Sequence, residues 1–137
     1  MKLTPQMQET IITELHEALP NLKALYIFGS FADDTANRES DIDIAYLAED
    51  TLDNIERWEI AQALAHRLNI DIDLIDLKTT NTVFRFQIVS TGERIFGGGY
   101  EVEKFEMLAY SFYLRFQEER QPIIDAVLAD KKVLKSA

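Results

Sequence analysis

The 137-residue chain has no cysteine and only five glycines and three prolines. Without cysteine it can form no disulfide bridge and perform no thiolate chemistry. So little glycine and proline excludes a linker-rich or disordered chain. No run approaches the ~20 uninterrupted apolar residues of a membrane span, and the start of the chain lacks the apolar segment of a signal peptide. We therefore expect a cytoplasmic protein that makes no contact with a membrane.

Basic residues are also scarce: 14 Lys and Arg stand against 24 Asp and Glu, which gives a formal net charge of −10 and a pI of about 4.6. Because affinity for nucleic acid comes from Lys and Arg displacing counterions, we expect no direct binding to nucleic acid. The acidity suits a basic partner or a cation-loaded site, or serves solubility alone. Apolar residues make up 47% of the chain, which is enough for the core of one domain.

Hydrophobic periodicity predicts alternating helices and strands. Helices are expected at residues 5–19, 52–68, 79–90, 100–120 and 123–133, and strands at residues 22–28, 41–47, 70–77 and 94–96. Gln121-Pro122 should separate the last two helices. This order predicts an α/β (α+β) fold, in which a small mixed sheet is flanked by helices and followed by a C-terminal helical tail. We expect one domain at residues 1–97, with residues 98–137 as a helical extension packed on it.

Two short segments contain residues that could bind phosphate or a metal ion. Gly29-Ser30 follows the first predicted strand, where a glycine lets the backbone approach a ligand and a serine offers its hydroxyl and N–H to phosphate oxygens. Asp41 and Asp43 lie two residues apart in the second strand, so both carboxylates project from one face. Such neighbours disfavour each other's ionisation unless a cation intervenes, and Mg²⁺ suits carboxylates together with phosphate. Each segment alone has a simpler explanation, a turn for the first and a solvated strand face for the second.

The third predicted strand supplies a further carboxylate. Asp71 and Asp73 share one face of this strand, and Asp76 lies on the other. Three carboxylates on two hydrophobic strands are unfavourable without metal. A site for two cations stabilises the attacking and leaving oxygens of an in-line displacement. The whole set therefore predicts phosphoryl or nucleotidyl transfer.

The ordered set of Gly29-Ser30, ten intervening residues, Asp41-x-Asp43 and a third Asp on a later strand resembles the signature of the DNA polymerase β-like nucleotidyltransferase superfamily. Over roughly residues 22–96 the chain is similar to the minimal nucleotidyltransferase (MNT) group, in its length and in the stretches LYIFGSFA, SDIDI and IDLIDL. Members of this group are the antitoxins of HEPN/MNT toxin–antitoxin pairs, whose toxins are HEPN-domain ribonucleases. The resemblance implies the polymerase β-like nucleotidyltransferase fold.

The resemblance also implies roles for the acidic residues. Asp41, Asp43 and Asp73 would be the catalytic residues and the ligands of Mg²⁺, with two ions expected. Asp73 would ligate the catalytic metal and help to deprotonate the incoming hydroxyl. Asp71 is the alternative for that role, because strand register deduced from sequence can slip.

Nucleotide binding is implied for four residues before and between these carboxylates. Gly29 and Ser30 would hold the triphosphate of ATP, the expected substrate. Arg38 and Ser40, in the connecting loop, could contact phosphate or orient a carboxylate; alternatively they form a surface ion pair and a turn. Lys78, just after the third strand, is a weaker candidate for a phosphate contact.

The function implied by the resemblance is transfer of AMP from ATP to a tyrosine of the cognate HEPN ribonuclease toxin, which would neutralise that partner. Two alternatives remain at this stage. One is nucleotidyl transfer to a small molecule, as in antibiotic-modifying relatives. The other is a non-catalytic antitoxin that inhibits its toxin by binding alone.

Three further expectations concern side chains outside these motifs. Trp58 lies on the apolar side of its predicted helix and should be in the core. His16 and His66 lack metal-ligand spacing and should be surface residues. The helix at residues 100–120 is apolar nearly all round, so it is either an internal core helix or carries a surface for a partner protein.

Overall fold

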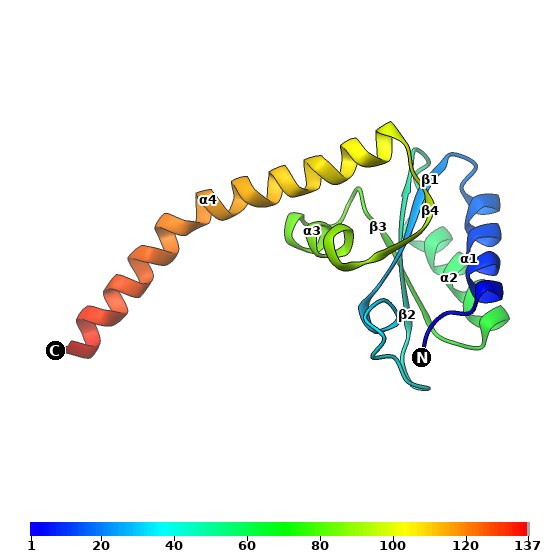
Figure 1. Ribbon diagram of the computed structural model, residues 1–137, viewed down its shortest axis with the longest axis horizontal. Helices are drawn as coiled ribbons and strands as arrows, with labels where there is room; N and C mark the ends of the chain where they lie inside the picture. Colours follow the sequence, from blue (N-terminus) through cyan, green and yellow to red (C-terminus); the bar gives the residue numbers. More distant parts are fainter. Residues whose placement is uncertain (137) are drawn as a thin grey trace.

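The computed structural model describes the backbone of residues 1–136 and the side chains as far as residue 131. Its centre is a four-stranded sheet in the order β3-β2-β1-β4 (Figure 1). The strands are β1 (Leu22–Phe28), β2 (Ile42–Ala48), β3 (Ile72–Asp76) and β4 (Glu93–Gly97). β1 runs antiparallel to both β2 and β4, whereas β2 and β3 are parallel. The predicted mixed sheet is therefore confirmed.

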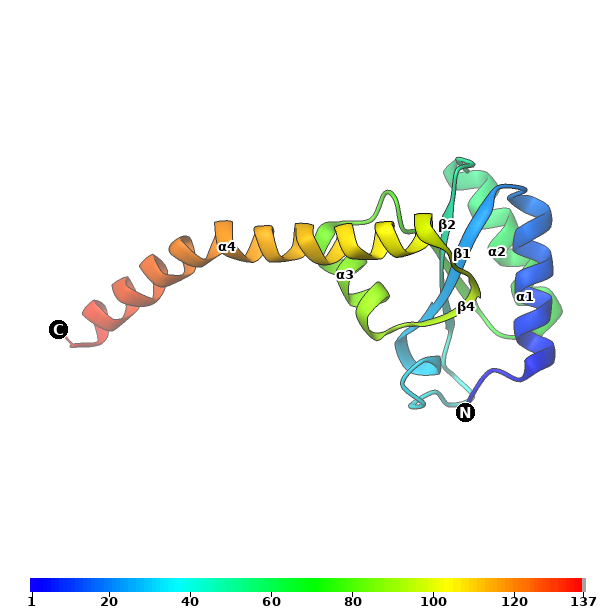
Figure 2. The same cartoon turned by 45° about the horizontal axis from the view of Figure 1, so that its top comes forward.

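Two layers of helices cover the sheet, one on each face (Figures 1 and 2). α1 (Pro5–Ala18) and α2 (Asn54–Leu68) lie on one face, and α3 (Thr82–Thr91) and the start of α4 (Tyr100–Ser136) lie on the other. A single 3₁₀ turn, η1 (Gly29–Phe31), follows β1 directly. No described helix has a stretch apolar and long enough to cross a bilayer.

Strand alternation divides the core between these two faces. The odd and even positions of β2 point to opposite sides of the sheet. Ile42, Ile44 and Tyr46 are buried in the cluster beneath α1 and α2. Ala45 and Leu47 are buried in the second cluster, beneath α3 and α4. Asp43 therefore projects on the side of α3, as the sequence pattern of this strand predicts.

The expected burial of Trp58 in α2 is wrong: its side chain is 62% exposed, and that of Ile55 is 69% exposed. The helix packs instead through Ala61 and Leu64, with Leu68 beside the same cluster. Periodicity identifies an apolar stripe, but α2 carries more apolar residues than one sheet contact can cover. The surplus residues face solvent.

The expected helix break at Gln121-Pro122 is also wrong, because α4 continues through Pro122 to Ser136. A proline inside a helix removes only one backbone hydrogen bond and can be accommodated by a bend. At 1.5 Å per residue the helix is about 55 Å long, and its second half extends away from the sheet domain (Figures 1 and 2). An entirely internal α4 is therefore excluded. His16 and His66 are exposed, as expected.

Hydrogen bonds among three side chains, Tyr26, Arg94 and Glu106, connect the first half of α4 to the sheet. The hydroxyl of Tyr26, on β1, donates to Glu106 Oε1 of α4 at 2.5 Å, and Arg94 of β4 donates to the same oxygen at 2.9 Å. Burial and the Glu106 carboxylate raise the pKa of Tyr26, so its hydroxyl remains a donor at neutral pH. The three side chains connect β1, β4 and α4.

Tyr26→Phe should lower the free energy of unfolding by about 1 kcal/mol, because it removes one hydrogen bond while Arg94 still donates to Glu106 and the ring stays in place. For a chain of this size the melting temperature should fall by roughly 3–5 °C. Thermal unfolding followed by circular dichroism measures this change. Tyr110→Phe is the matched control, since Tyr110 is 41% exposed and its hydroxyl has no hydrogen bond among the described residues. An equal effect in both variants would contradict the role of the Glu106 contact.

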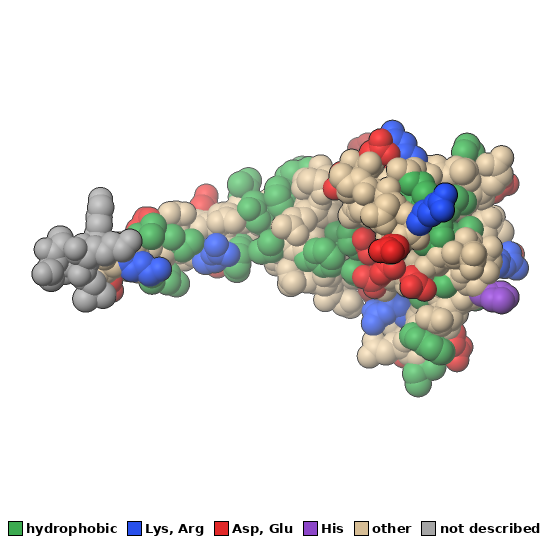
Figure 3. Space-filling model, turned by 90° about the horizontal axis from the view of Figure 1, so that it is seen from below, with side chains coloured by type: hydrophobic (Ala, Val, Ile, Leu, Met, Phe, Trp, Pro, Cys, Tyr) green, Lys and Arg blue, Asp and Glu red, His purple; other side chains and the backbone are tan. Residues whose placement is uncertain are grey.

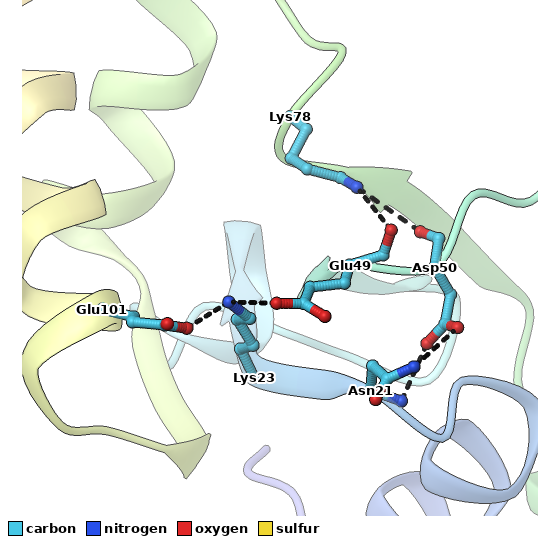
Figure 4. Close-up of polar contacts among 6 residues, drawn as sticks. All are labelled: Asn21, Lys23, Glu49, Asp50, Lys78 and Glu101. Carbon is cyan, nitrogen blue, oxygen red and sulfur yellow. Dashed lines mark hydrogen bonds and ion pairs between the residues drawn. The ribbon is translucent and has the colours of Figure 1, made fainter.

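A second polar cluster is drawn in Figure 4. It lies where β1 begins and where β2 and β3 end, which is the end of the sheet opposite Gly29. Lys23 pairs with Glu49 at 3.1 Å and with Glu101 at the start of α4, and both partners raise the pKa of the ammonium. Lys78 Nζ lies 3.4 Å from the carbonyl oxygens of Glu49 and Asp50. The suggested phosphate contact of Lys78 is thus wrong, because this side chain lies beyond the far end of β3.

Candidate active site

The end of β1 and the beginnings of β2 and β3 meet at one end of the sheet. Since β1 and β2 are antiparallel, Phe28 lies opposite Asp43. Since β2 and β3 are parallel, Asp43 lies beside Asp73. Gly29, Asp43 and Asp73 are therefore neighbours across three strands, although 44 positions separate the first from the last in sequence. Acidic side chains gather beside apolar ones on this face of the molecule (Figure 3).

Gly29 is in close contact with the central carboxylate. Its φ angle is +72°, in the left-handed region that glycine adopts without strain. A Cβ atom added here would lie 2.3 Å from Asp43 Oδ2, well inside van der Waals contact. The backbone after β1 can thus lie against Asp43 only because residue 29 has no side chain.

The charge on Asp43 is unfavourable in the protein alone. Burial, and then the neighbouring carboxylates of Asp73 and Asp41, raise the pKa of Asp43 from 3.8 to about 6. Asp41 and Asp73 are exposed, while Asp43 is half-buried between them. A positive charge among these three groups would reverse the shift, so the electrostatics favour a bound cation.

Asp71 and Asp73, the two candidates for the third carboxylate, occupy different surroundings. Asp73 is paired with Asp43 in the sheet register and contributes to the pKa shift of Asp43. Asp71 precedes β3 and accepts a backbone hydrogen bond from Ile42 at 2.9 Å through its carbonyl. The Asp71 carboxylate is not among the groups that raise the pKa of Asp43. The geometry favours Asp73 as the third member.

The donor set fits a divalent metal in its chemistry. Asp41, Asp43 and Asp73 offer only oxygen, which Mg²⁺ prefers, and leave room for phosphate oxygens to complete its shell. Within the described residues, no three His, Asp or Glu side chains are already gathered to hold one ion. Binding would thus bring the three carboxylates closer together than they are in this structure.

The remaining predicted nucleotide ligands lie on either side of these carboxylates. Ser30 is in η1, and its hydroxyl has no hydrogen-bond partner among the described residues. Ser40 Oγ accepts the backbone N–H of Asn37 at 2.9 Å, so it forms the turn that leads into β2. Arg38 is exposed and pairs with no carboxylate in the described part of the chain. Arg38 and Ser40 line a polar depression of about 260 Å³ beside Asp41, not beside Gly29.

The sequence motifs do not indicate that α3 contributes to this end of the sheet. Phe84, Gln87, Ile88 and Thr91 of α3 face Gly29 across a cavity of about 350 Å³. Their spacing of three or four residues is that of one helix face, but periodicity does not reveal which distant element a face meets. Arg85 on the same helix donates to the carbonyls of residues 77, 78 and 80 and so fixes the loop before α3.

Residues 9–99 match the family described as polymerase beta, nucleotidyltransferase. The chain is also 46% identical over 123 residues to the protein adenylyltransferase MntA of Shewanella oneidensis, an alignment that covers 90% of this chain and 88% of the relative. The matched segment contains the glycine-serine turn and all three carboxylates. The resemblance deduced from the motifs is confirmed.

Solved structures give the same result. A crystal structure of a toxin–antitoxin with AMP-PNP matches with a TM-score of 0.81 and 46% identity, covering 88% of this chain and 98% of the other. A tri-AMPylated Shewanella oneidensis HEPN toxin in complex with its MNT antitoxin matches with a TM-score of 0.76 and 43% identity, covering 90% and 97%. By sequence and by fold, this chain belongs to the polymerase beta nucleotidyltransferase family.

Proposed function

We propose that this chain is the antitoxin of a HEPN/MNT pair and neutralises its toxin by transferring AMP from ATP to a tyrosine, with Mg²⁺ as cofactor, in the cytoplasm where ATP is supplied. The observation that carries the proposal is the convergence of Gly29, Asp43 and Asp73 at one end of the sheet. The MntA relative, alike over nearly its full length, is a protein adenylyltransferase. Solved relatives contain AMP-PNP or an AMPylated HEPN toxin.

The transfer needs an acceptor oxygen, a proton acceptor and a leaving group. The tyrosine oxygen attacks the α-phosphorus of ATP, a new P–O bond forms, and the bond from the α-phosphorus to the bridging oxygen breaks to release pyrophosphate. The carboxylate of Asp73 takes the tyrosine proton. Gly29 and Ser30 hold the triphosphate by their backbone and hydroxyl, and Arg38 and Ser40 are supporting candidates near the loop. Such a reaction depends on positioning and charge neutralisation.

Magnesium would be held by Asp41, Asp43 and Asp73. When bound, it neutralises charge on the phosphate oxygens as the reaction proceeds. The raised pKa of Asp43 supports this assignment, because it shows a carboxylate held where its own charge is disfavoured without a cation. On the toxin, each added AMP brings a negative phosphate and bulk, which would oppose RNA binding or catalysis.

Incubation of the chain with its purified toxin, Mg²⁺ and ATP labelled in the adenine ring tests this proposal. Label should appear on the toxin and should be lost when a chelator removes Mg²⁺. Inhibition of the ribonuclease without label would instead identify an antitoxin that acts by binding alone.

The part of α4 that follows Tyr113 is the proposed contact surface for the toxin. Beyond its packing on α3 through Phe86 and Tyr113, whose rings stack at 3.8 Å, the helix exposes large apolar side chains. They are Leu114, Ile123, Val127 and Leu128. Large apolar side chains exposed together on one segment mark protein interfaces. The helical extension would then be a docking element attached to the catalytic domain.

Leu114→Lys should weaken toxin binding at least tenfold, since it replaces an exposed apolar contact of the proposed surface by a charge. Leu114 is 61% exposed, so the fold should not change. Calorimetric titration of the toxin measures the affinity, and Gln62→Lys, at an exposed position on α2 away from α4, is the control for one added positive charge. Unchanged affinity in Leu114→Lys and in Leu128→Lys would remove this part of α4 from the interface.

A further inference from the structure

We propose that the cavity between the end of β1 and α3 is the binding site for the adenine base of ATP, and that Gln87 determines the choice of base. This inference rests on the proposed function, because it takes a nucleoside triphosphate as the substrate. It names the part of the substrate that the carboxylates and Gly29 leave unassigned. Nothing in the glycine-serine and aspartate motifs selects a base.

The position of the cavity is the first argument. Gly29 lines it, and the same residue lies against Asp43 on its other side. A nucleotide whose phosphates lie at Gly29 and the carboxylates therefore has this cavity within reach of its nucleoside part. The volume of about 350 Å³ is within the range of small-molecule sites.

The lining is the second argument. Phe28 and Phe84 form an edge-to-face pair, with ring centroids 5.5 Å apart, and Ile88 is buried beneath them. Among the residues that the structure describes, no Lys or Arg lines the cavity, so it offers little to a phosphate group. An aromatic and aliphatic wall instead favours a flat, uncharged ring, since bases stack on aromatic side chains.

Gln87 supplies a polar group in the wall of this cavity. Gln87 is exposed, and its side-chain amide makes no hydrogen bond within the described residues, although its backbone carbonyl accepts the Thr91 hydroxyl at 2.6 Å. A glutamine amide can donate to N7 and accept from the N6 amino group of adenine at the same time. Guanine offers two acceptors, O6 and N7, at that edge, so it cannot satisfy both halves of the amide.

The test is equilibrium binding to the isolated, full-length chain in the presence of Mg²⁺, with ATP, GTP and inorganic tripolyphosphate as probes. Phe84→Leu and Gln87→Ala should each weaken ATP binding about tenfold and leave tripolyphosphate binding unchanged. Gln87→Ala should also reduce the preference for ATP over GTP about tenfold. Ser90→Ala is the control, because Ser90 lies on α3 outside the cavity and its hydroxyl bonds the carbonyl of Phe86. Gln87→Ala remains decisive if Phe84→Leu lowers the thermal stability.

Unchanged ATP affinity in both variants would overturn the base site, as would equal weakening of ATP and tripolyphosphate, which would place phosphate in the cavity. Different outcomes contradict the proposed function. If the parent chain binds ATP with the predicted variant effects but does not label the toxin, the base site is supported and AMP transfer to the toxin is contradicted. If the parent chain labels the toxin while both variants bind ATP normally, AMP transfer is supported and the base site is contradicted. A parent chain that binds no ATP overturns both.

Discussion

Asp43→Asn is expected to lower the rate of AMP transfer by about a thousandfold or more, because it removes a charged oxygen ligand from the centre of the carboxylate group. Asp43 is the half-buried member of this group, beside Asp73 in the sheet and against Gly29. Single-turnover labelling of the toxin at saturating ATP measures the loss. Asp71→Asn, at the neighbouring aspartate outside this group, should retain activity within severalfold.

Asp43→Asn should also stabilise the protein in magnesium-free buffer. The pKa of Asp43 is about 6 in the folded protein and 3.8 when unperturbed, so the folded state binds the proton more tightly. The free energy of unfolding therefore falls as pH rises from about 4 to 6, and this loss persists in full above pH 6. Asp43→Asn removes the loss and should raise the free energy of unfolding by about 1–2 kcal/mol at pH 7.5, after allowance for partial exposure.

Thermal unfolding between pH 4 and 8 measures this effect. The difference between Asp43→Asn and the parent chain should be small at pH 4 and largest above pH 6. Addition of Mg²⁺ should raise the melting temperature of the parent chain more than that of the variant. A variant that is less stable than the parent at pH 7.5 without Mg²⁺ would contradict the electrostatic account of this residue.

Gly29→Ala is expected to reduce AMP transfer about a hundredfold while the chain remains folded. The new Cβ would lie 2.3 Å from Asp43 Oδ2, and a φ of +72° is strained for alanine. The strain should lower the free energy of unfolding by about 1–2 kcal/mol. The larger effect on activity follows because the carboxylate must move, and small displacements in a reacting site have large kinetic consequences.

Gly99→Ala separates the two contributions. Gly99 has a φ of +92°, so alanine is strained there as well, but a Cβ at this position meets nothing within 4 Å. This variant should share the loss of stability and retain full activity. A comparable loss of activity in both variants would show that the contact between residue 29 and Asp43 does not matter for the reaction.

Local patterns predicted the parts of the fold that local physics determines. The period-two alternation in residues 42–47 assigned Ile42 and Ile44 to one face and Asp43 to the other, which the two core clusters confirm. The predicted start of the first helix at residue 5 is confirmed, and its cause is also local, because the Thr4 hydroxyl accepts from Met7 N–H and caps α1. The mixed sheet followed from the order of elements.

Features that depend on distant segments were not accessible in the same way. The burial of Trp58 was wrong because periodicity gives a stripe without saying how much of it the sheet covers. Pro122 was misjudged because the rule on proline describes a lost hydrogen bond, which a long helix can tolerate. The contact of Gly29 with Asp43 and the cavity beside α3 arise only from tertiary packing, so no local sequence pattern predicts them.

The most direct test of the account compares two reactions that differ only in the position of the label in ATP. Purified toxin, the chain and Mg²⁺ are incubated with ATP labelled at the α-phosphate or at the γ-phosphate, and the intact mass of the toxin is recorded. AMP transfer predicts α-label on the toxin, γ-label only in released pyrophosphate, and a mass increase of one AMP for each modified tyrosine. γ-Label on the toxin, or an inhibited toxin that carries neither label, would contradict the account.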